Sequence, residues 1–458
     1  MESLSLVIAK FGGTSVANFE AMQNCVKIVT ANPQCKLVVT SAPAGITNHL
    51  VELGKTPMPE EDKEVILDLI KQQVFDIHEQ LVDKSSVKNK LDALFTGIQK
   101  VVYADGINES PMLQDELLSF GERLASVLLT ACFVQAGADA LEFDVREIML
   151  TDDNFGSAVP ELEQLAEKSE KQLKPLLGNH IIITQGFIGK TAWGDTTTLG
   201  RGGSDYTAAL LSEALSANRC EIWTDVAGVF STDPRIDDKA YPIPELSYDE
   251  AAEMANFGAK VLHPATLAPT LRNNIPVFVG STRAPELGGT TIVKDCQFEP
   301  TFRAITRRKE QQLVTLHTPK MERSSQFIGK VFNILDQFGL SIDLITTSET
   351  FISLTFNAWH ATNLAQASSR ALAELEKICI VEVTPNLDLI TIVGNNLHAK
   401  HGGAGKIFEV LETVRIRMIS YGANPHNISF LVDQEDSTGV IRELHQHLLA
   451  ENLNRPQS

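Results

Sequence analysis

The stretch that decides the fold is Thr197-Thr198-Leu199-Gly200-Arg201-Gly202-Gly203-Ser204-Asp205-Tyr206-Thr207, and strong helix formers follow it from Ala208 to Leu215. A glycine loop that runs into a helix presents bare backbone N–H groups and the positive helix end to an anion. Arg201 adds a planar cation suited to a carboxylate or a phosphate. A plain helix start with Ser204 or Asp205 as the cap explains the same residues equally well. The loop alone therefore leaves both interpretations open.

A second glycine turn lies near the N-terminus, where Lys10-Phe11-Gly12-Gly13-Thr14-Ser15 follows the apolar run 6–9 and precedes a helical pattern over 17–29. The turn matches neither the Walker A pattern nor G-x-G-x-x-G. Its lysine stands before the glycines, so it would lie at the end of a strand and point into a site. A surface lysine beside a turn is the alternative.

Further β-type runs occupy 36–40, 180–184, 220–225 and 275–279, and helical segments separate them. Strands that alternate with helices predict a parallel α/β sheet, in which ligands bind at the carboxyl ends of the strands. Several polar or glycine positions come at or just after such ends, which predicts one shared site. These positions are Lys10, Ser41, Gly186, Arg201 and Thr224.

Two helical stretches carry less information. Residues 113–134 have helical periodicity and include Glu122, and a lone glutamate on a helix is usually solvated. Residues 60–100 are polar and prone to form helices, with charges on most faces, and we expect an exposed helical excursion without chemistry there.

The composition is that of a globular protein, with 43% hydrophobic and 21% charged residues among 458. A net charge of −19 argues against nucleic acid and against an anionic membrane surface as partners. The six cysteines contain no C-x-x-C pair, which favours a reduced, cytoplasmic protein without a zinc or other metal site. The N-terminus reads as a first strand rather than a signal peptide, and no apolar run reaches the ~18 residues of a membrane span.

The last third of the chain repeats itself after 76 positions, since Gly329-Lys330-Val331-Phe332 aligns with Gly405-Lys406-Ile407-Phe408. Each copy predicts strand, helix, strand, strand, helix in the ferredoxin-like style. The copies span about 312–383 and 388–450, and the basic segment 301–310 is interpreted as a linker or, alternatively, as a strand added to the second copy. Such a pair behind an enzyme suggests a ligand sensor, with a purely structural dimerisation role as the alternative.

Four motifs resemble those of the aspartate kinases, which belong to the amino-acid kinase family and end in tandem ACT domains. They are Lys10–Ser15, Gly200–Asp205, Trp223–Phe230 and Phe257–Pro264. Together they are specific, and the resemblance covers nearly the whole chain. It implies an amino-acid kinase fold over 1–300, in which helices sandwich a mostly parallel sheet. Two ferredoxin-like ACT domains over 311–385 and 386–458 would follow, the first binding the effector.

The implied reaction is transfer of a phosphoryl group from ATP, with Mg²⁺, to L-aspartate, the first step toward lysine, threonine and methionine. Lys10 and Asp205 would be catalytic. The resemblance implies nucleotide contacts at Gly12, Gly13, Gly202, Gly203, Thr224, Asp225, Phe230, Arg235, Lys260 and Val261. It implies aspartate contacts at Ser41, Thr47, Glu122, Arg201 and Ser204. Phe230 departs from the tyrosine that the family often has there, which keeps stacking but removes a hydroxyl contact.

Residues 344–349 look like the effector stretch of the lysine-inhibited, monofunctional class, for which we expect no homoserine dehydrogenase domain after residue 458. The implied lysine site lies between first ACT copies of two subunits, in a homodimer or a dimer of dimers. Its positions are Met321, Ser324, Phe327, Ile328, Ser341, Ile342, Asp343, Thr347, Ser348 and Glu349. The second copy has Ile419 opposite Asp343 and Pro425 opposite Glu349, so the first copy should bind the effector.

Two alternatives remain at this point. One is a kinase of the same fold for another small acid such as glutamate, acetylglutamate or carbamate. The other is a non-catalytic regulator that only binds amino acids. The ACT tail and Glu122 argue against the first, and the presence of Lys10, Arg201, Asp205 and Lys260 argues against the second.

Overall fold

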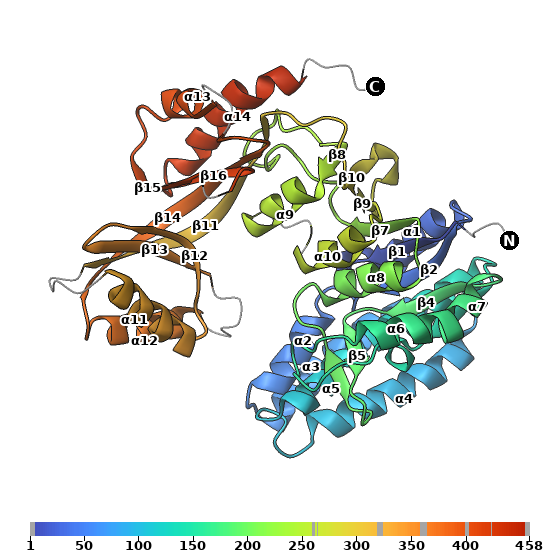
Figure 1. Cartoon of the computed structure of the whole chain (residues 1–458). Helices are drawn as coiled ribbons and strands as arrows, with labels where there is room; N and C mark the ends of the chain where they lie inside the picture. The colour runs from blue at the N-terminus through green and yellow to red at the C-terminus, as the bar shows by residue number, and fades with distance from the viewer. Residues whose placement is uncertain are drawn as a thin grey trace. The chain divides into compact units, whose positions relative to one another are not determined.

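The computed structural model describes residues 5–258, 262, 264–317, 324–357, 364–398, 403–422 and 424–453 (Figure 1). The chain forms two compact units. The first comprises Met1–Val229, Pro242–Ala255 and Lys260–Cys296, and the second comprises Phe230–Tyr241, Asn256–Ala259 and Gln297–Ser458. Two short segments that interrupt the first unit in the sequence, 230–241 and 256–259, therefore belong to the second unit.

Unit 1 is built on an eight-stranded sheet with the order β3-β4-β2-β1-β7-β9-β10-β8. The strands are β1 (Val7–Phe11), β2 (Cys35–Thr40), β3 (Ala140–Phe143), β4 (Ile181–Gln185), β7 (Arg219–Thr224), β8 (Glu245–Ser247), β9 (Val277–Ser281) and β10 (Gly289–Val293). All neighbours are parallel except β9 and β10, as expected from alternating strands and helices. A separate antiparallel hairpin joins β5 (Ile188–Lys190) to β6 (Thr196–Thr198).

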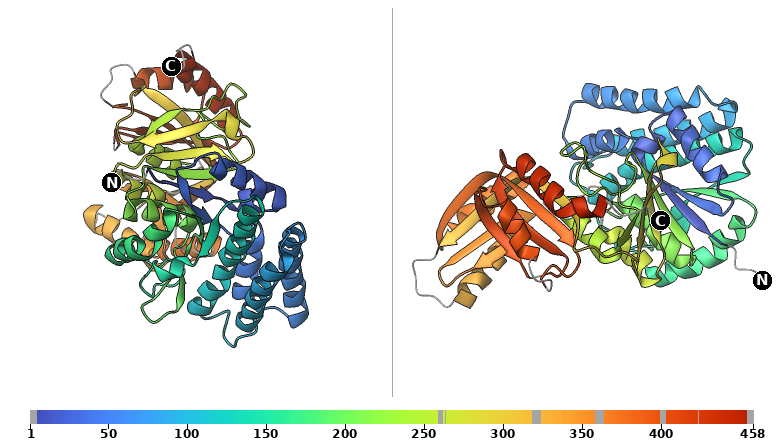
Figure 2. Two further views of the ribbon diagram at one scale, coloured as in Figure 1. Left: turned by 90° about the vertical axis from the view of Figure 1, so that its right-hand side faces the viewer. Right: turned by 90° about the horizontal axis from the view of Figure 1, so that it is seen from above.

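Helices cover both faces of this sheet, with the blue and cyan helices on one face and green helices on the other in the right-hand view of Figure 2. They are α1 (Phe19–Thr30), α2 (Ile46–Lys55), α3 (Glu60–His78), α4 (Lys84–Val102), α5 (Pro111–Gln135), α6 (Leu162–Lys168), α7 (Lys174–Leu177), α8 (Gly203–Ala214), α9 (Tyr248–Asn256) and α10 (Pro264–Arg272). The layered arrangement confirms the predicted α/β class.

Helix α5 is the central helix of unit 1, since it contacts α1 to α4 and strands β2, β3 and β4. It is the one helix in the described residues that is long and apolar enough to pass for a membrane span, and 72% of that apolar window is buried inside the protein. Ser110 caps its first turn through the Leu113 N–H, and Pro111 stands at the first helical position, where it costs no hydrogen bond.

The expectation of an exposed excursion over 60–100 is wrong. Helices α3 and α4 bury Ile70, Val74, Leu91 and Phe95 in the same apolar core as α5. The many charges of this segment lie around a narrow apolar stripe on each helix. A stripe of that width suffices when the partner is another helix rather than a sheet.

Unit 2 contains one six-stranded antiparallel sheet with the order β12-β13-β11-β14-β16-β15. Its elements are β11 (Phe302–His317), α11 (Ser324–Gln337), β12 (Ser341–Thr347), β13 (Phe351–Asn357), α12 (Leu364–Leu375), β14 (Ile380–Gly394), α13 (Gly403–Val410), β15 (Ile416–Tyr421), β16 (Asn427–Asp433) and α14 (Ser437–Leu453). Each copy of the repeat has the predicted order of strand, helix, strand, strand, helix. The strand order is symmetric about the β11–β14 pair, as a duplication requires.

Segment 301–310 is no linker, because residues 302–317 form the single long strand β11. Its first part pairs with the half of β14 that belongs to the second copy, for example Ile305 with Ile392. Its last part pairs with β13 of the first copy, for example Leu316 with Ile352. The alternative interpretation, a strand added to the second copy, describes this arrangement. Every second position from 302 to 306 carries an uncharged residue, namely Phe302, Ala304 and Thr306, which is a pattern typical of a strand. The arginines and the lysine of this segment made that pattern hard to recognise.

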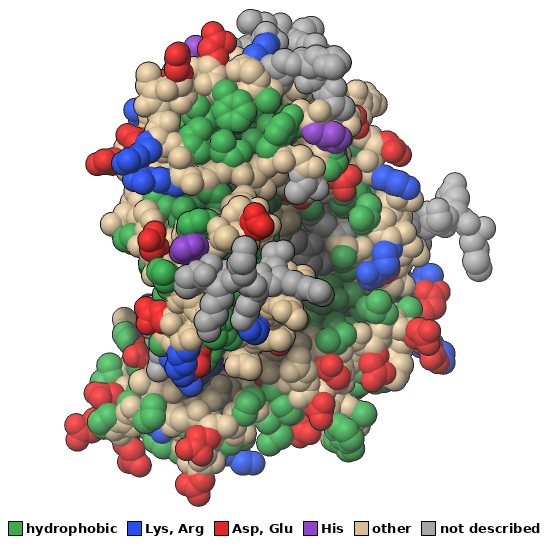
Figure 3. Space-filling model, turned by 60° about the vertical axis from the view of Figure 1, so that its left-hand side comes forward, with side chains coloured by type: hydrophobic (Ala, Val, Ile, Leu, Met, Phe, Trp, Pro, Cys, Tyr) green, Lys and Arg blue, Asp and Glu red, His purple; other side chains and the backbone are tan. Residues whose placement is uncertain are grey.

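Unit 2 leaves several large apolar side chains exposed, among them Phe332, Phe351, Ile380 and Phe408. The space-filling view also shows apolar side chains gathered into a patch on one face of the molecule (Figure 3). Apolar surface of this kind is typical of regions that bind another protein surface.

Candidate active site

Lys10 lies on β1, the strand between β2 and β7 near the middle of the sheet. The side chain is 8% exposed, although its neighbours in the sheet are apolar. Its Nζ lies 2.5 Å from Oδ1 of Asp205, which stands in the first turn of α8. The two glycine turns of the sequence therefore meet through one ion pair. Of the five positions predicted to share a site, Lys10, Ser41 and Arg201 line one cavity, whereas Gly186 and Thr224 are not among its lining residues.

The α8 N-terminus does not have the side-chain cap that was the alternative to an anion site. The cap residue is Gly202, which has a left-handed φ of 75° that favours glycine, and no side chain caps the helix. Neither Ser204 nor Asp205 acts as the cap. The Gly203 N–H donates to the Gly200 carbonyl at 3.0 Å, so the N–H groups of the next residues in the first turn are the ones that a ligand could bind.

The loop after β1 closely approaches the loop after β2. A Cβ on Gly13 would lie 2.8 Å from the carbonyl oxygen of Ala42, which is too close for any other residue without movement. The Gly13 carbonyl also accepts a hydrogen bond from the Ala44 N–H at 3.0 Å. The pair of loops thus forms a compact backbone wall beside Lys10.

A cavity of about 610 Å³ opens in front of these groups. The predicted residues that line it are Lys10, Gly13, Ser41, Thr47, Glu122, Arg201, Gly202, Gly203, Ser204 and Asp205. All of them belong to unit 1. Arg201 is exposed on the loop before α8, and no ion pair within the described residues occupies it.

Glu122 is buried on α5 and faces this cavity. Its Oε1 accepts a hydrogen bond from the Ala42 N–H at 3.2 Å, whereas Oε2 has no hydrogen-bond partner in the described part of the chain. Burial raises the pKa of this carboxyl to about 8, although the Ala42 N–H and the charge of Lys10 act in the opposite direction. A buried oxygen without a partner is the feature that a cationic ligand group would satisfy.

Asp115 is a lining residue that the sequence analysis missed. Its carboxyl is buried on α5 and accepts three hydrogen bonds, from the Gly156 N–H at 2.8 Å and from the N–H and hydroxyl of Thr198 at 2.7 and 2.8 Å. One side chain thus holds the loop at Gly156 and the end of strand β6, which leads to Arg201, at the border of the cavity. In the sequence it stands between Gln114 and Glu116, which reads as a solvated helix surface.

The predicted nucleotide residues are more dispersed. Gly12 donates its N–H to the carbonyl of Trp223 at 3.1 Å, while Thr224 and Asp225 follow at the end of β7. Phe230 and Arg235 belong to unit 2, and the Arg235 guanidinium is paired with Asp233 at 2.8 Å. Lys260 and Val261 lie outside the described residues.

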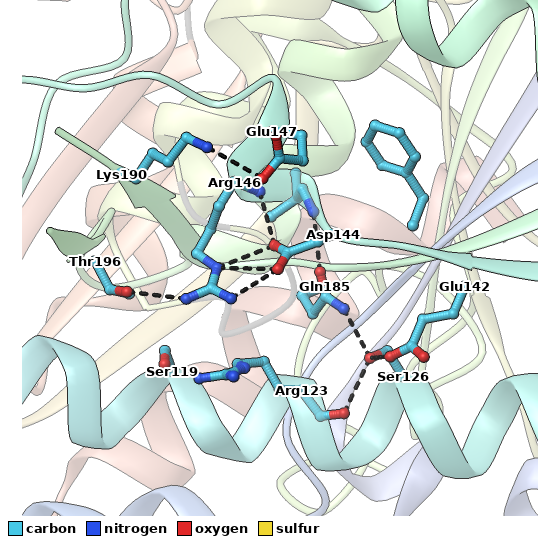
Figure 4. A network of polar contacts seen from close by, with 12 residues as sticks. Ser119, Arg123, Ser126, Glu142, Asp144, Arg146, Glu147, Gln185, Lys190 and Thr196 are labelled. Carbon is cyan, nitrogen blue, oxygen red and sulfur yellow. Dashed lines mark hydrogen bonds and ion pairs between the residues drawn. The ribbon is translucent and has the colours of Figure 1, made fainter. Parts of the chain in front are cut away.

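A second cavity of about 420 Å³ lies on the other side of α5, with a polar network beside it (Figure 4). Arg146 forms a bidentate pair with Asp144, and Gln185 donates to the Ser126 hydroxyl at 2.8 Å. Arg123, the residue after Glu122, lines this cavity. The network fixes the carboxyl ends of β3 and β4 against α5, the helix that carries Glu122.

The predicted effector residues lie on α11, β12 and the turn after β12. Phe327 is buried, and Thr347, Ser348 and Glu349 are exposed. The Asp343 carboxylate already pairs with Arg308, whose guanidinium also donates to the Asn256 carbonyl. Burial raises the pKa of Asp343, and Arg308 opposes that shift. Ile328 and Ile342 are half-buried. The structure describes the backbone of Ser324 and Ser341 but not their side chains, and Met321 lies outside the described residues.

Comparisons with known proteins agree with this geometry. Residues 5–281 match the model of the amino acid kinase family, and residues 390–448 match an ACT domain. The chain is 46% identical to the lysine-sensitive aspartokinase 3 of Escherichia coli over 97% of this chain and 99% of that protein. It is 32% identical to the chloroplastic aspartokinase 1 of Arabidopsis thaliana over 96% of this chain and 79% of that protein.

Solved structures give the same result. The aspartokinase III of E. coli in complex with aspartate and ADP superposes with a TM-score of 0.86 at 45% identity, covering 97% of this chain and all of that one. The same enzyme with lysine and aspartate gives a TM-score of 0.85 over 97% and 99% of the two chains. The chain therefore belongs to the amino acid kinase family and, within it, to the aspartokinases.

Proposed function

We propose that this aspartokinase transfers the γ-phosphoryl group of ATP to the side-chain carboxylate of L-aspartate and releases 4-phospho-L-aspartate and ADP. The observation that carries the proposal is one cavity that holds the buried Lys10–Asp205 pair, the uncapped α8 N-terminus, Arg201 and the unpartnered Oε2 of Glu122. The E. coli relative whose structure contains aspartate and ADP supports it. In the cell the reaction would be the first step toward lysine, threonine and methionine, in the cytoplasm.

The chemistry needs no general base, because the attacking carboxylate of aspartate is already ionised at neutral pH. Catalysis then consists of positioning and of stabilising charge on the transferred group. Lys10 supplies a cation at the strand end, and Asp205 holds its ammonium in place. The backbones of Gly12, Gly13, Gly202 and Gly203 would line the phosphates at close approach, and the α8 N-terminus would stabilise their negative charge.

The other end of the cavity suits the amino-acid group of aspartate. Arg201 would bind the α-carboxylate, and Glu122 would accept the α-ammonium through its unpartnered Oε2. Ser41, Thr47 and Ser204 would add polar contacts. A substrate with an α-carboxylate and an α-ammonium would pair with both Arg201 and Glu122. Acetylglutamate and carbamate have no ammonium group, so they would leave Glu122 without a partner.

We assign the nucleotide, bound as its magnesium complex, to Thr224, Asp225, Phe230, Arg235, Lys260 and Val261 in addition to the glycines. The strand end at β7 supports the first two positions. Phe230 offers an aromatic face and no hydroxyl, so its contribution would be stacking.

We further propose inhibition by L-lysine at the first ACT copy, with the two lysine ammonium groups recognised by Asp343 and Glu349. The remaining contacts of this site would be Met321, Ser324, Phe327, Ile328, Ser341, Ile342, Thr347 and Ser348. The E. coli relative with lysine bound supports this, as do the apolar and proline residues at the matching positions of the second copy. Exposed Phe332, Phe351 and Ile380 support a homodimer or dimer of dimers formed through unit 2.

The test is ATP-dependent hydroxamate formation by the purified full chain with a panel of aspartate, glutamate, acetylglutamate and carbamate. We expect turnover with aspartate and progressive loss of it on titration with lysine. Turnover with another acid alone would replace the substrate assignment. A lysine-dependent rise in melting temperature without any turnover would favour the non-catalytic regulator instead.

A further inference from the structure

Three polar side chains in unit 2 form a buried chain of contacts outside the site described above. Nε2 of His445, on α14, lies 2.9 Å from Oγ of Ser231, and its Nδ1 lies 2.9 Å from Oδ2 of Asp237. Ser231, Asp237 and His445 are 0%, 3% and 2% exposed. The imidazole therefore joins two points of the segment 230–241 to the last helix of the chain.

The hydrogen-bonding capacities of these groups fit one arrangement of protons. Oγ of Ser231 accepts a hydrogen bond from the Tyr241 N–H at 3.0 Å, so its own hydroxyl proton is available to His445. Nε2 of a neutral imidazole then accepts, and Nδ1 carries the proton on the side of Asp237. Burial lowers the pKa of His445, while Asp237 opposes that shift. The neutral form follows from the desolvation of the ring.

Ser, His and Asp in this order also occur in hydrolases, but the present burial excludes that use. A nucleophile must be reached by its substrate, and Ser231 is fully buried. The geometry is that of a structural connection, which we call the His445 clip: Ser231, Asp237 and His445.

Two further contacts hold the same segment on α14. Nε of Arg442 donates to the carbonyl of Ile236 at 2.7 Å, and the Ile236 side chain is buried in the apolar core that α14 shares with β14 and β16. The Ser231 carbonyl accepts a hydrogen bond from the Ile305 N–H at 2.8 Å, which adds β11 to the contacts. The conformation of 230–241 is thus fixed from the side of unit 2.

Both ends of the segment continue into unit 1. The Val229 N–H donates to the hydroxyl of Thr290 at 2.7 Å, and the Val229 carbonyl accepts from the Ile243 N–H at 2.8 Å. These bonds close the base of the loop, so its interior depends on the contacts with α14. Phe230 and Arg235, two of the proposed nucleotide residues, lie within that interior.

We propose that His445 is a positioning residue for nucleotide binding: through Ser231 and Asp237 it holds the loop that carries Phe230 and Arg235 in its binding conformation. The inference rests on the proposed function, because it takes these two residues as nucleotide contacts. It assigns to the regulatory repeat a direct structural role in the affinity for ATP. A loop without the clip would populate other conformations, and the apparent affinity falls in proportion to the competent fraction.

The experiment compares four full-length variants by steady-state kinetics and by thermal unfolding. Ser231→Ala removes one contact with little change in volume, and His445→Asn retains a donor near Asp237. His445→Ala removes the whole clip. His447→Ala is the matched control, because His447 is exposed on the same helix and contacts only the Glu443 carbonyl, at 2.8 Å, among the hydrogen bonds of the described residues.

We expect Ser231→Ala and His445→Ala to raise KM for ATP by about two- to tenfold, the ratio that corresponds to one net hydrogen bond. KM for aspartate should stay within a factor of two, since its cavity lies entirely in unit 1. His445→Asn should recover part of the loss, and His447→Ala should match the wild type. A lower melting temperature with an unchanged KM for ATP would overturn the proposal and leave a purely structural role. An inactive wild type would instead refute the proposed function, so the two failures are distinguishable.

Discussion

Glu122 and Ala42 are joined by one hydrogen bond of 3.2 Å to Oε1 of the carboxyl, and the other oxygen of that carboxyl is buried without a hydrogen-bond partner among the described residues. Burial raises the pKa of Glu122 to about 8, and the single hydrogen bond from Ala42 and the charge of Lys10 do not offset that desolvation. A bound ammonium would satisfy the second oxygen and favour the ionised form. The carboxyl is therefore prepared for a cationic group rather than for solvent.

Aspartate binding at pH 7 should release a proton from Glu122. The free protein holds this carboxyl mostly protonated, since pH 7 lies below its pKa of about 8, and the substrate ammonium selects the carboxylate. Calorimetric titration with aspartate in buffers of different ionisation enthalpy measures the release. Glu122→Gln should bind aspartate at least about tenfold more weakly and release no proton. Equal proton release by both proteins would assign the effect to another group.

The same carboxyl should make stability depend on pH. Its folded-state pKa of about 8 lies above its ordinary value of 4.5, so the unfolded chain loses this proton first as the pH rises. Its contribution to the free energy of unfolding is therefore present below pH 4.5 and falls progressively up to about pH 8. Melting temperatures of the wild type minus those of Glu122→Gln should decline across this window. A flat difference would contradict the raised pKa.

Replacement of Lys10 should abolish turnover and also expose its structural role. Lys10→Met should lower kcat by at least about 10²- to 10³-fold, the usual effect of removing one group that stabilises transferred charge. It also leaves the Asp205 carboxylate, whose side chain is 15% exposed, without its ion-pair partner, which should lower the melting temperature. The double variant Lys10→Met with Asp205→Asn should regain stability but not activity. A double variant as unstable as Lys10→Met would show that the pair does not hold the strand to α8.

Asp115→Asn should raise KM for aspartate while kcat changes less. The amide keeps the shape but replaces one of the acceptor oxygens that hold Gly156 and Thr198, so the loop at Gly156 and the end of β6 lose part of their support. Steady-state kinetics should show an increase of about three- to thirtyfold, as expected when buried donors lose their acceptor. Asp92→Asn, an exposed carboxyl on α4, serves as the control. Identical values for both variants would mean that the loops are held by other contacts.

Asp343→Asn and Glu349→Gln should each relieve inhibition by lysine with a modest effect on uninhibited turnover. Each change removes one carboxylate proposed to bind a lysine ammonium, and the concentration of lysine for half-inhibition should rise by about tenfold or more. Lysine titrations of activity measure this shift. Glu382→Ala, an exposed carboxylate on β14, should behave as the wild type. Unchanged inhibition in both variants would place the effector elsewhere.

The carboxyl ends of the strands, and the polar residues that follow them, could be predicted because short sequence patterns determine them. Apolar runs followed at once by Lys10, Ser41 or Thr224 indicate strand ends, and parallel strands bring their ends to one edge. The repeat of the last third was equally visible, since a fixed displacement of 76 positions needs no structure to detect. The family resemblance added the role of Glu122, which its own helical context does not reveal.

The burial of several side chains could not be predicted from the sequence. Asp115 and His445 look like ordinary polar helix residues, and their significance depends on loops from distant parts of the chain. The apolar stripes of α3 and α4 were missed for the same reason, since many charges surround them. Nothing local in 230–241 indicates that this segment packs with the second unit.

The shared strands β11 and β14 have a practical consequence for engineering. Each strand runs through both repeats, with register shifts in their pairing between Arg308 and Leu313, so a cut at 311 or 385 would divide a strand rather than a connecting loop. A chimera meant to exchange inhibitor preference with a relative must therefore transplant the pair of repeats together. Grafting one repeat alone would leave half of each strand facing a foreign partner, and such hybrids should accumulate as insoluble material during expression.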